Sequence, residues 1–160
     1  MTTPPRFDIM GYSHHAIYKA SGFTAKELSL PRIAVINSWS EQSPGHVHLK
    51  AVAEGVKAGI RMAGGMPFEI NVPGLCSVPH KVESDMLYDM PQREAVLAAA
   101  ESSLYISWCD GWVGIGTCDK ITIELIGPYG MAAMWRQRVA ACPFAAVMVV
   151  KSDGCVQACA

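Results

Sequence analysis

The short run RIAVIN at residues 32–37 constrains the fold more than any other feature of the sequence. It is apolar, short and rich in β-branched residues, which is typical of a strand buried on both faces. Apolar residues at helical spacing follow over residues 46–65, and a pair of glycines ends that periodicity. A second run with strand character, MPFEINVPG, covers residues 66–74. A strand, a helix and a strand of this length predict one βαβ unit with parallel strands.

The alternation of strand and helix continues along the rest of the chain. Residues 92–109 read as a helix, and Pro91 suits the start of one because the first helical residues need no amide donor. A short strand at 111–116, a helix at 131–139 and a strand at 145–150 follow. The order β-α-β-α-β-α-β predicts a parallel sheet with helices on both faces, a three-layer α/β/α architecture.

The domain organisation follows from where this alternation begins. Residues 1–30 read as an N-terminal arm that includes a short helix around residues 14–22, and residues 31–160 read as a partial α/β domain. Apolar residues make up 51% of the 160 residues, which supplies a substantial core.

Charge and hydropathy exclude several function classes. The net charge is −1, with no long run of one sign, which argues against nucleic acid or an anionic membrane as a partner. The apolar stretch near the end is broken by Pro143 and is too short to span a bilayer. The N-terminus lacks the pattern of a signal peptide, so we expect a cytoplasmic protein whose six cysteines are thiols rather than disulfides.

Chemistry is expected where the parallel strands end, because ligands of such sheets bind beyond their carboxyl ends. Cys118, Asp119 and Lys120 directly follow the predicted strand at 111–116. A carboxylate suits magnesium, and a thiolate suits a softer centre such as an iron–sulfur cluster. A lysine can join a cation site as a neutral amine or as a carbamate. The alternative roles are a buried small hydrophobe for Cys118, a helix cap for Asp119 and a solvated Lys120.

The loop after the first predicted strand, NSWSEQSPGH, lies at the same edge. Ser38, Trp39 and Glu41 are candidates for packing against a substrate or a cluster, since loops at strand ends carry function. His46 and His48 flank the start of the following helix. We interpret both as capping or solvated histidines rather than as members of a site.

Four sequence blocks carry a resemblance to a known family. They are INSWSEQSPGHVHL (36–49), AGGMPFEINVPG (63–74), MLYDMPQRE (86–94) and GTCDKIT (116–122). In this order and at these separations they resemble the N-terminal region of the dihydroxy-acid dehydratases, a family that includes phosphogluconate and sugar-acid dehydratases. The resemblance runs from about Gly11 to Thr122.

The resemblance implies a hydro-lyase that converts a 2,3-dihydroxy acid into a 2-oxo acid with an iron–sulfur cluster, either 2Fe–2S or 4Fe–4S, and Mg²⁺. It implies that Cys118 ligates the cluster, that Asp119 binds magnesium, and that Lys120 binds magnesium after carbamylation. It also implies a small dihydroxy acid as substrate and a homodimer when the protein is complete.

The segment after the second predicted strand departs from the family pattern. The family usually has DDGIAMGHGGM there, and its second aspartate binds magnesium; the counterpart here is CSVPHKVESDM, with Ser77 at that position. Glu83 or Asp85 could replace the missing carboxylate, and Cys76 is either an extra thiol ligand or a buried cysteine. This segment favours a sugar-acid dehydratase or an uncharacterised relative, whereas PGH and CDKIT favour the enzyme of branched-chain amino-acid biosynthesis.

Family members are several-fold longer than this chain. We therefore expect a truncated dehydratase that is inactive alone. The alternative is a non-catalytic α/β module, or a decayed paralogue, that pairs with a full-length dehydratase.

Overall fold

The computed structural model describes residues 9–74, 87–107, 109–117, 147–150 and 156–159. In chain order its elements are α1 (Ile9–Ala20), the 3₁₀ helix η1 (Glu27–Ser29), β1 (Arg32–Asn37), α2 (Leu49–Met62), β2 (Met66–Asn71), α3 (Asp89–Ser107), β3 (Gly111–Ile115), β4 (Val147–Val150) and β5 (Val156–Cys159).

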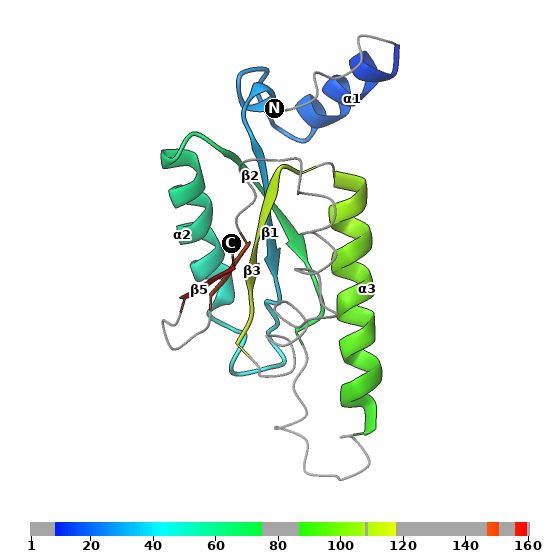
Figure 1. The fold of residues 1–160 in the computed structure, drawn as a ribbon, viewed down its shortest axis with the longest axis vertical. Coiled ribbons are helices and arrows are strands. Elements are labelled where there is room, and N and C mark those ends of the chain that lie inside the picture. Colours follow the sequence, from blue (N-terminus) through cyan, green and yellow to red (C-terminus); the bar gives the residue numbers. More distant parts are fainter. Residues whose placement is uncertain (1–8, 75–86, 108, 118–146, 151–155, 160) are drawn as a thin grey trace.

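The strands form one five-stranded sheet in the order β2-β1-β3-β4-β5 (Figure 1). The pairs β1–β2, β1–β3 and β3–β4 are parallel, which confirms the predicted α/β fold. The final strand, β5, pairs antiparallel with β4 and was not predicted from the sequence. The helix expected at 131–139 lies outside the described residues.

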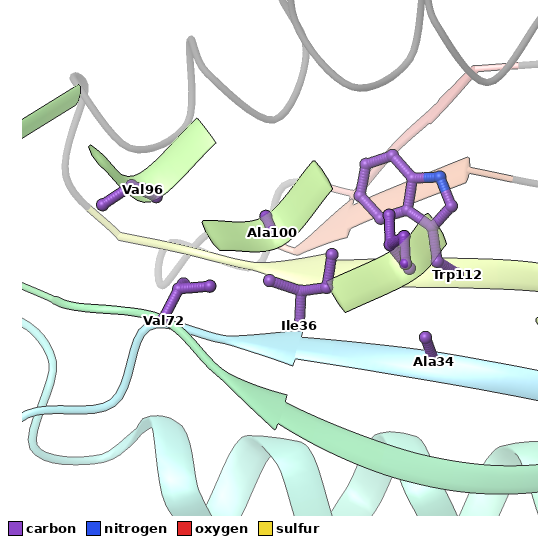
Figure 2. Close-up of a cluster of buried hydrophobic side chains, with 7 residues drawn as sticks. Ala34, Ile36, Val72, Val96, Ala100 and Trp112 are labelled. Carbon is purple, nitrogen blue, oxygen red and sulfur yellow. The ribbon is translucent and has the colours of Figure 1, made fainter. Parts of the chain in front are cut away.

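Helices α2 and α3 cover opposite faces of the sheet (Figure 1). Successive side chains of a strand point to opposite faces, and β1 follows this rule with residues buried on both sides. Ala34 and Ile36 pack with one cluster, whereas Val35 packs with the other. The cluster beneath α3 consists of Ala34, Ile36, Val72, Val96, Ala100, Leu104 and Trp112 (Figure 2). The cluster beneath α2 consists of Val35, Leu49, Ala53 and Ile115. The four central residues of RIAVIN, residues 33–36, are all apolar because the strand lies between these two layers.

The predicted helix boundaries are close to those observed. Helix α2 ends where the sequence predicts, and Gly64 takes a left-handed backbone conformation with φ of 83° that glycine adopts without a steric penalty. Helix α3 begins at Asp89, so Pro91 lies in its first turn, where a missing amide donor leaves no hydrogen bond unmade.

Helix α1 lies at the end of the sheet where the strands begin, away from their carboxyl ends (Figure 1). The division between an arm at 1–30 and a domain at 31–160 stays a prediction. Within the described part of the chain, no helix combines the length and apolar character needed to cross a membrane.

Candidate functional site

Three strand ends meet at one edge of the sheet. In the strand register, Asn37 at the end of β1 lies opposite Asn71 of β2 on one side and Ile115 of β3 on the other. The ladder continues one step beyond the strands, because the Ser38 amide donates to the Ile115 carbonyl at 3.2 Å and the Val72 amide donates to the Asn37 carbonyl at 2.9 Å. The segments that follow these strands therefore start side by side (Figure 1).

His46 is fully buried in the loop after β1. Its Nδ1 atom lies 2.7 Å from the carbonyl oxygen of Ser38 and 3.2 Å from the Ser38 hydroxyl, and that hydroxyl donates a hydrogen bond to the Ile115 carbonyl at 3.0 Å. A carbonyl oxygen only accepts hydrogen bonds, and the hydroxyl proton of Ser38 is already used in the hydrogen bond to Ile115. The proton of the neutral imidazole must therefore be on Nδ1, which leaves Nε2 with a free lone pair.

The Nε2 atom of His46 is buried and has no hydrogen-bond partner among the described residues. Burial lowers the pKa of His46, and the nearby charge of His48 lowers it further, against an opposing effect of the Ser38 hydrogen bond. The ring is therefore neutral at physiological pH. A buried neutral imidazole with an open lone pair is suited to accept a hydrogen bond or to ligate a metal.

Glycines allow the neighbouring segments to approach His46 closely. A Cβ atom on Gly74, after β2, would lie 1.8 Å from the Ser38 carbonyl oxygen and 2.8 Å from Nδ1 of His46. A Cβ atom on Gly45 would lie 3.6 Å from the Thr117 hydroxyl, after β3. We call Ser38, Gly45, His46, Gly74 and Thr117 the edge cluster.

Two further hydroxyls at this edge are buried without a partner in the described structure. They are the side-chain oxygens of Ser43 and Thr117. Buried polar atoms normally have a hydrogen-bond partner, so several unpartnered atoms at one place indicate a region that other groups complete.

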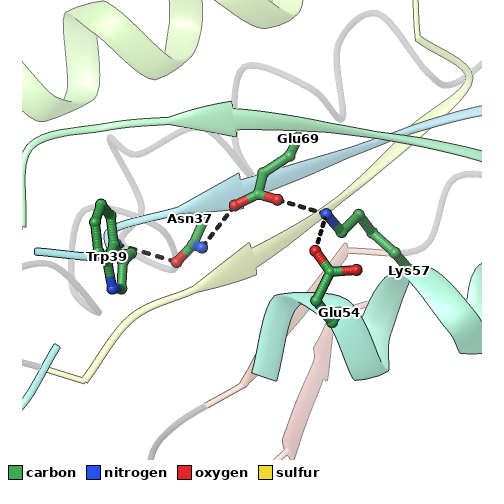
Figure 3. Close-up of polar contacts among 5 residues, drawn as sticks. All are labelled: Asn37, Trp39, Glu54, Lys57 and Glu69. Atoms are coloured by element: carbon green, nitrogen blue, oxygen red, sulfur yellow. Dashed lines mark hydrogen bonds and ion pairs between the residues drawn. The ribbon is translucent and has the colours of Figure 1, made fainter. Parts of the chain in front are cut away.

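A charged network anchors the start of the loop after β1 (Figure 3). The Asn37 side-chain amide donates to Glu69 of β2 at 2.8 Å, and its side-chain oxygen accepts from the Trp39 amide at 3.1 Å. The other oxygen of Glu69 lies 2.7 Å from Nζ of Lys57, which also contacts Glu54 at 2.6 Å.

The pKa values of this network follow from those contacts. Burial raises the pKa of Glu69, but the hydrogen bonds from Lys57 and Asn37 and the charges of Lys57 and Lys50 together lower it below its ordinary value. The hydrogen bonds to Glu54 and then Glu69 raise the pKa of Lys57. Both groups therefore stay charged around neutral pH.

Comparison with known proteins places this edge within a family domain. The family model for the dihydroxy-acid/6-phosphogluconate dehydratase N-terminal region matches residues 30–144. The chain belongs to this dehydratase family. It is 46% identical over 108 residues to the dihydroxy-acid dehydratase of Pyrococcus furiosus and 46% identical over 109 residues to that of Methanococcoides burtonii. These alignments cover 68% of this chain and 20% of each relative, so the chain spans about a fifth of their length.

The matched region of the dehydratase domain includes the whole edge cluster and all the predicted ligands. Cys118, Asp119 and Lys120 directly follow Thr117 in the sequence but lie outside the described residues, so their roles stay predictions. Four further candidates from the segment after β2 also lie outside: Cys76, Ser77, Glu83 and Asp85. Within the ranges the structure describes, no group of three or more His, Cys, Asp and Glu side chains could hold a metal ion.

The interpretation of His46 as a capping or solvated histidine is wrong. His46 is buried, and the residue at the N-cap of α2 is the exposed His48, which makes no side-chain cap hydrogen bond. Of the other candidates in this loop, Ser38 is buried in the edge cluster, Trp39 is half-buried and Glu41 is exposed.

Glu69 and Gly74 were missed by the sequence reasoning. A carboxylate within the apolar strand MPFEIN is a signal that it has a specific partner, and this signal could have identified Glu69. The close approach of Gly74 to Ser38 has no comparable local signal, because it depends on two loops that lie far apart in the sequence.

Cys109 does not belong to this site. It precedes β3 and therefore lies towards the opposite end of that strand from Thr117. Burial raises the pKa of its thiol to about 12, which keeps it protonated around neutral pH.

Proposed function

We propose that this chain is the N-terminal part of a hydro-lyase that removes water from a 2,3-dihydroxy carboxylic acid to give a 2-oxo acid. The observation that carries the proposal is the position of Thr117 in the edge cluster at the carboxyl end of β3, immediately before Cys118, Asp119 and Lys120. Family membership over residues 30–144 supports the reaction class.

In this proposal Cys118 holds an iron–sulfur cluster, and Asp119 and a carbamylated Lys120 hold magnesium. The donor types fit, since a thiolate is the usual cluster ligand and carboxylate or carbamate oxygens suit magnesium. The unpartnered buried atoms of His46, Ser43 and Thr117 also fit an edge that another group completes. When bound, the two centres would supply Lewis-acid sites for the departing hydroxyl and for the carboxylate of the acid.

The described residues contribute to such a site by fixing the loop after β1 beside the end of β3. The Asn37–Glu69–Lys57 network fixes the direction in which the chain leaves β1, and the Ser38–Ile115 and Ser38–His46 hydrogen bonds join this loop to β3. A loop that is fixed by several buried hydrogen bonds keeps the bound ligands close to a productive geometry.

Substrate choice within the family has two candidates. The blocks PGH and CDKIT favour a branched 2,3-dihydroxy acid and a role in branched-chain amino-acid biosynthesis. The matched relatives are named dihydroxy-acid dehydratases, which supports a dihydroxy acid as the substrate class. The unusual segment CSVPHKVESDM favours a sugar acid.

A second candidate function is a non-catalytic module that pairs with a full-length dehydratase. The observation that favours it is that exposed apolar side chains lie just before α3 and in its last turn, at the two ends of this helix. These side chains are Leu87, Tyr88, Tyr105 and Ile106.

Anaerobic reconstitution of the 160-residue chain with iron and sulfide tests the first function. We expect visible cluster absorption that is lost in Cys118→Ser and retained in Cys109→Ser, the matched control with a buried and protonated thiol. Dehydration of branched dihydroxy acids and of sugar acids is then assayed with the chain alone and with a full-length dehydratase. A wild-type chain that forms no cluster would contradict the proposal, and stable co-purification of the metal-free chain with the full-length enzyme would favour the second function.

A further inference from the structure

We propose that the outer edge of β2 is an interface at which two copies of this chain pair antiparallel and join their sheets into one. Strand β2 stands at one end of the strand order and is hydrogen-bonded to β1 alone. Its other side therefore presents a row of backbone donors and acceptors that no strand in the described part of the chain uses.

The backbone bonds to β1 show which residues of β2 face outward. The Met66 amide donates to the Pro31 carbonyl at 2.8 Å, and the Val72 amide donates to the Asn37 carbonyl at 2.9 Å. Backbone groups of successive strand residues point to alternate sides, so the even-numbered residues of β2 bond to β1. The odd-numbered residues direct their amides and carbonyls to the outer edge.

Only two of these outward residues can donate a hydrogen bond. Pro67 has no amide proton, and a strand tolerates proline where the missing amide would point away from the neighbouring strand. Pro73, just beyond the strand, has none either. The donors available to a partner are therefore the amides of Glu69 and Asn71.

One antiparallel register joins β2 to itself without a conflict. When the two-fold axis passes Ile70, Glu69 of each copy lies opposite Asn71 of the other, and each such pair exchanges both of its backbone hydrogen bonds. A register centred on Glu69 would oppose two carboxylates, which is unfavourable. A register centred on Asn71 would place Glu69 opposite Pro73, beyond the end of the strand. Hydrogen bonding and charge thus favour a second copy aligned about Ile70.

The side chains on both faces of β2 suit this register. Ile70 is half-buried and packs against the core beneath α3, so Ile70 of the second copy would cover part of its remaining surface. On the other face, the Glu69 carboxylate is already paired with Nζ of Lys57 at 2.7 Å, and Asn71 is exposed and neutral. The pairing brings no unpaired charge to the axis. Because it is short, we expect a weak dimer that depends on concentration.

Disulfide trapping tests the register. Residues that face each other across the axis without exchanging hydrogen bonds have Cα atoms about 4.5 Å apart, within the range of a disulfide. Ile70→Cys should therefore form a covalent dimer on mild oxidation, and mass spectrometry should find residue 70 linked to residue 70. Phe68→Cys is the matched control, since Phe68 is also half-buried beneath α3 but would lie about 14 Å from its copy. The wild type, oxidised in parallel, gives the background of its six cysteines.

Charge variants at an exposed position keep the test decisive if Ile70→Cys does not fold. Asn71→Asp places a carboxylate opposite Glu69 of the second copy, whereas Asn71→Lys places an ammonium there. Sedimentation at low salt should show a dissociation constant about two- to tenfold higher for the first and lower for the second. Gln42→Asp and Gln42→Lys change the net charge equally at an exposed site outside β2 and should leave it nearly unchanged.

Three results would overturn the inference. They are a wild-type chain that stays monomeric up to millimolar concentration, equal trapping of Phe68→Cys and Ile70→Cys, and Asn71 variants that shift dissociation no more than the Gln42 variants. None of these results bears on the proposed function, which concerns the opposite outcome of cluster formation rather than the association of β2.

Discussion

The side-chain amide of Asn37 donates a 2.8 Å hydrogen bond to the carboxylate of Glu69, although these residues are not opposite each other in the sheet. Asn37 pairs with Asn71 in the strand register, and Glu69 pairs with Val35. The Asn37 side chain therefore reaches back along the neighbouring strand, and this orientation directs its oxygen to the Trp39 amide. One carboxylate of β2 thus sets the first turn of the loop that carries His46 (Figure 3).

Replacing Glu69 by glutamine is expected to destabilise the fold. The variant loses the ion pair with Lys57, in which both side chains are largely buried, and we expect a loss of about 1–2 kcal/mol in the free energy of unfolding. Urea denaturation measures this loss. Glu54→Gln is the control, because Glu54 contacts the same ammonium but is 62% exposed and should cost less than about 0.5 kcal/mol. Equal losses in the two variants would contradict the assigned importance of Glu69.

The same network predicts a dependence of stability on pH. The pKa of Glu69 lies below its ordinary value of 4.5 in the folded chain, so the unfolded chain binds a proton more readily. The stabilisation is therefore complete well above pH 4.5 and is lost as the pH falls below that value. Free energies of unfolding measured from neutral to acid pH should fall less steeply for Glu69→Gln than for the wild type. Parallel curves would show that Glu69 does not contribute.

Gly74→Ala is expected to disturb the edge cluster. Its Cβ would lie 1.8 Å from the Ser38 carbonyl oxygen, so the loop backbone must move, at a cost of about 1–3 kcal/mol. Gly55→Ala in α2 is the control, because nothing lies within 4 Å of its added Cβ and alanine in a helix is better than glycine by about 0.5–1 kcal/mol. Thermal unfolding should show opposite shifts for the two variants. Two stabilised variants would refute the close approach.

The tautomer of His46 can be measured without any metal. Nitrogen NMR of the metal-free chain should show a neutral ring with the proton on Nδ1, because the Ser38 carbonyl oxygen accepts from that atom at 2.7 Å. Most exposed neutral histidines carry the proton mainly on the other nitrogen, so the exposed His48 provides an internal reference. A proton on Nε2 of His46 instead of Nδ1 would rule out the hydrogen bond to the Ser38 carbonyl oxygen.

Among the residues that the structure describes, Trp112 is the largest fully buried side chain, and it lies in the core beneath α3 (Figure 2). Trp112→Ala removes most of a buried ring and should cost about 3–5 kcal/mol in the free energy of unfolding. Met62→Ala changes a side chain that is 90% exposed and should cost less than about 0.5 kcal/mol. Urea denaturation of both variants checks the assignment of this core, which a small loss in Trp112→Ala would contradict.

The sequence by itself determined the elements of the sheet and the family of the chain. The apolar run at 32–37, the glycine pair after α2 and the strand at 111–116 are local patterns, and each produced the element it predicted with shifts of a few residues at most. Local patterns suffice here because a strand buried on both faces requires a continuous apolar run and a helix with one buried face requires apolar residues at its own period. The order and separations of the four sequence blocks likewise predicted the family that the comparison confirmed.

The tertiary structure alone decided what surrounds His46. The sequence places this residue between a loop and a helix, where a solvated or capping role is the usual outcome, yet it is buried and its partner oxygen belongs to a loop joined to β3. The hydrogen bonds that hold this edge of the sheet together connect residues far apart in the chain: 77 positions separate Ser38 from Ile115, and 32 separate Asn37 from Glu69. Such contacts arise only when parallel strands bring their carboxyl ends together, so burial, tautomer and partner at this edge follow from the packing of the sheet rather than from any local pattern.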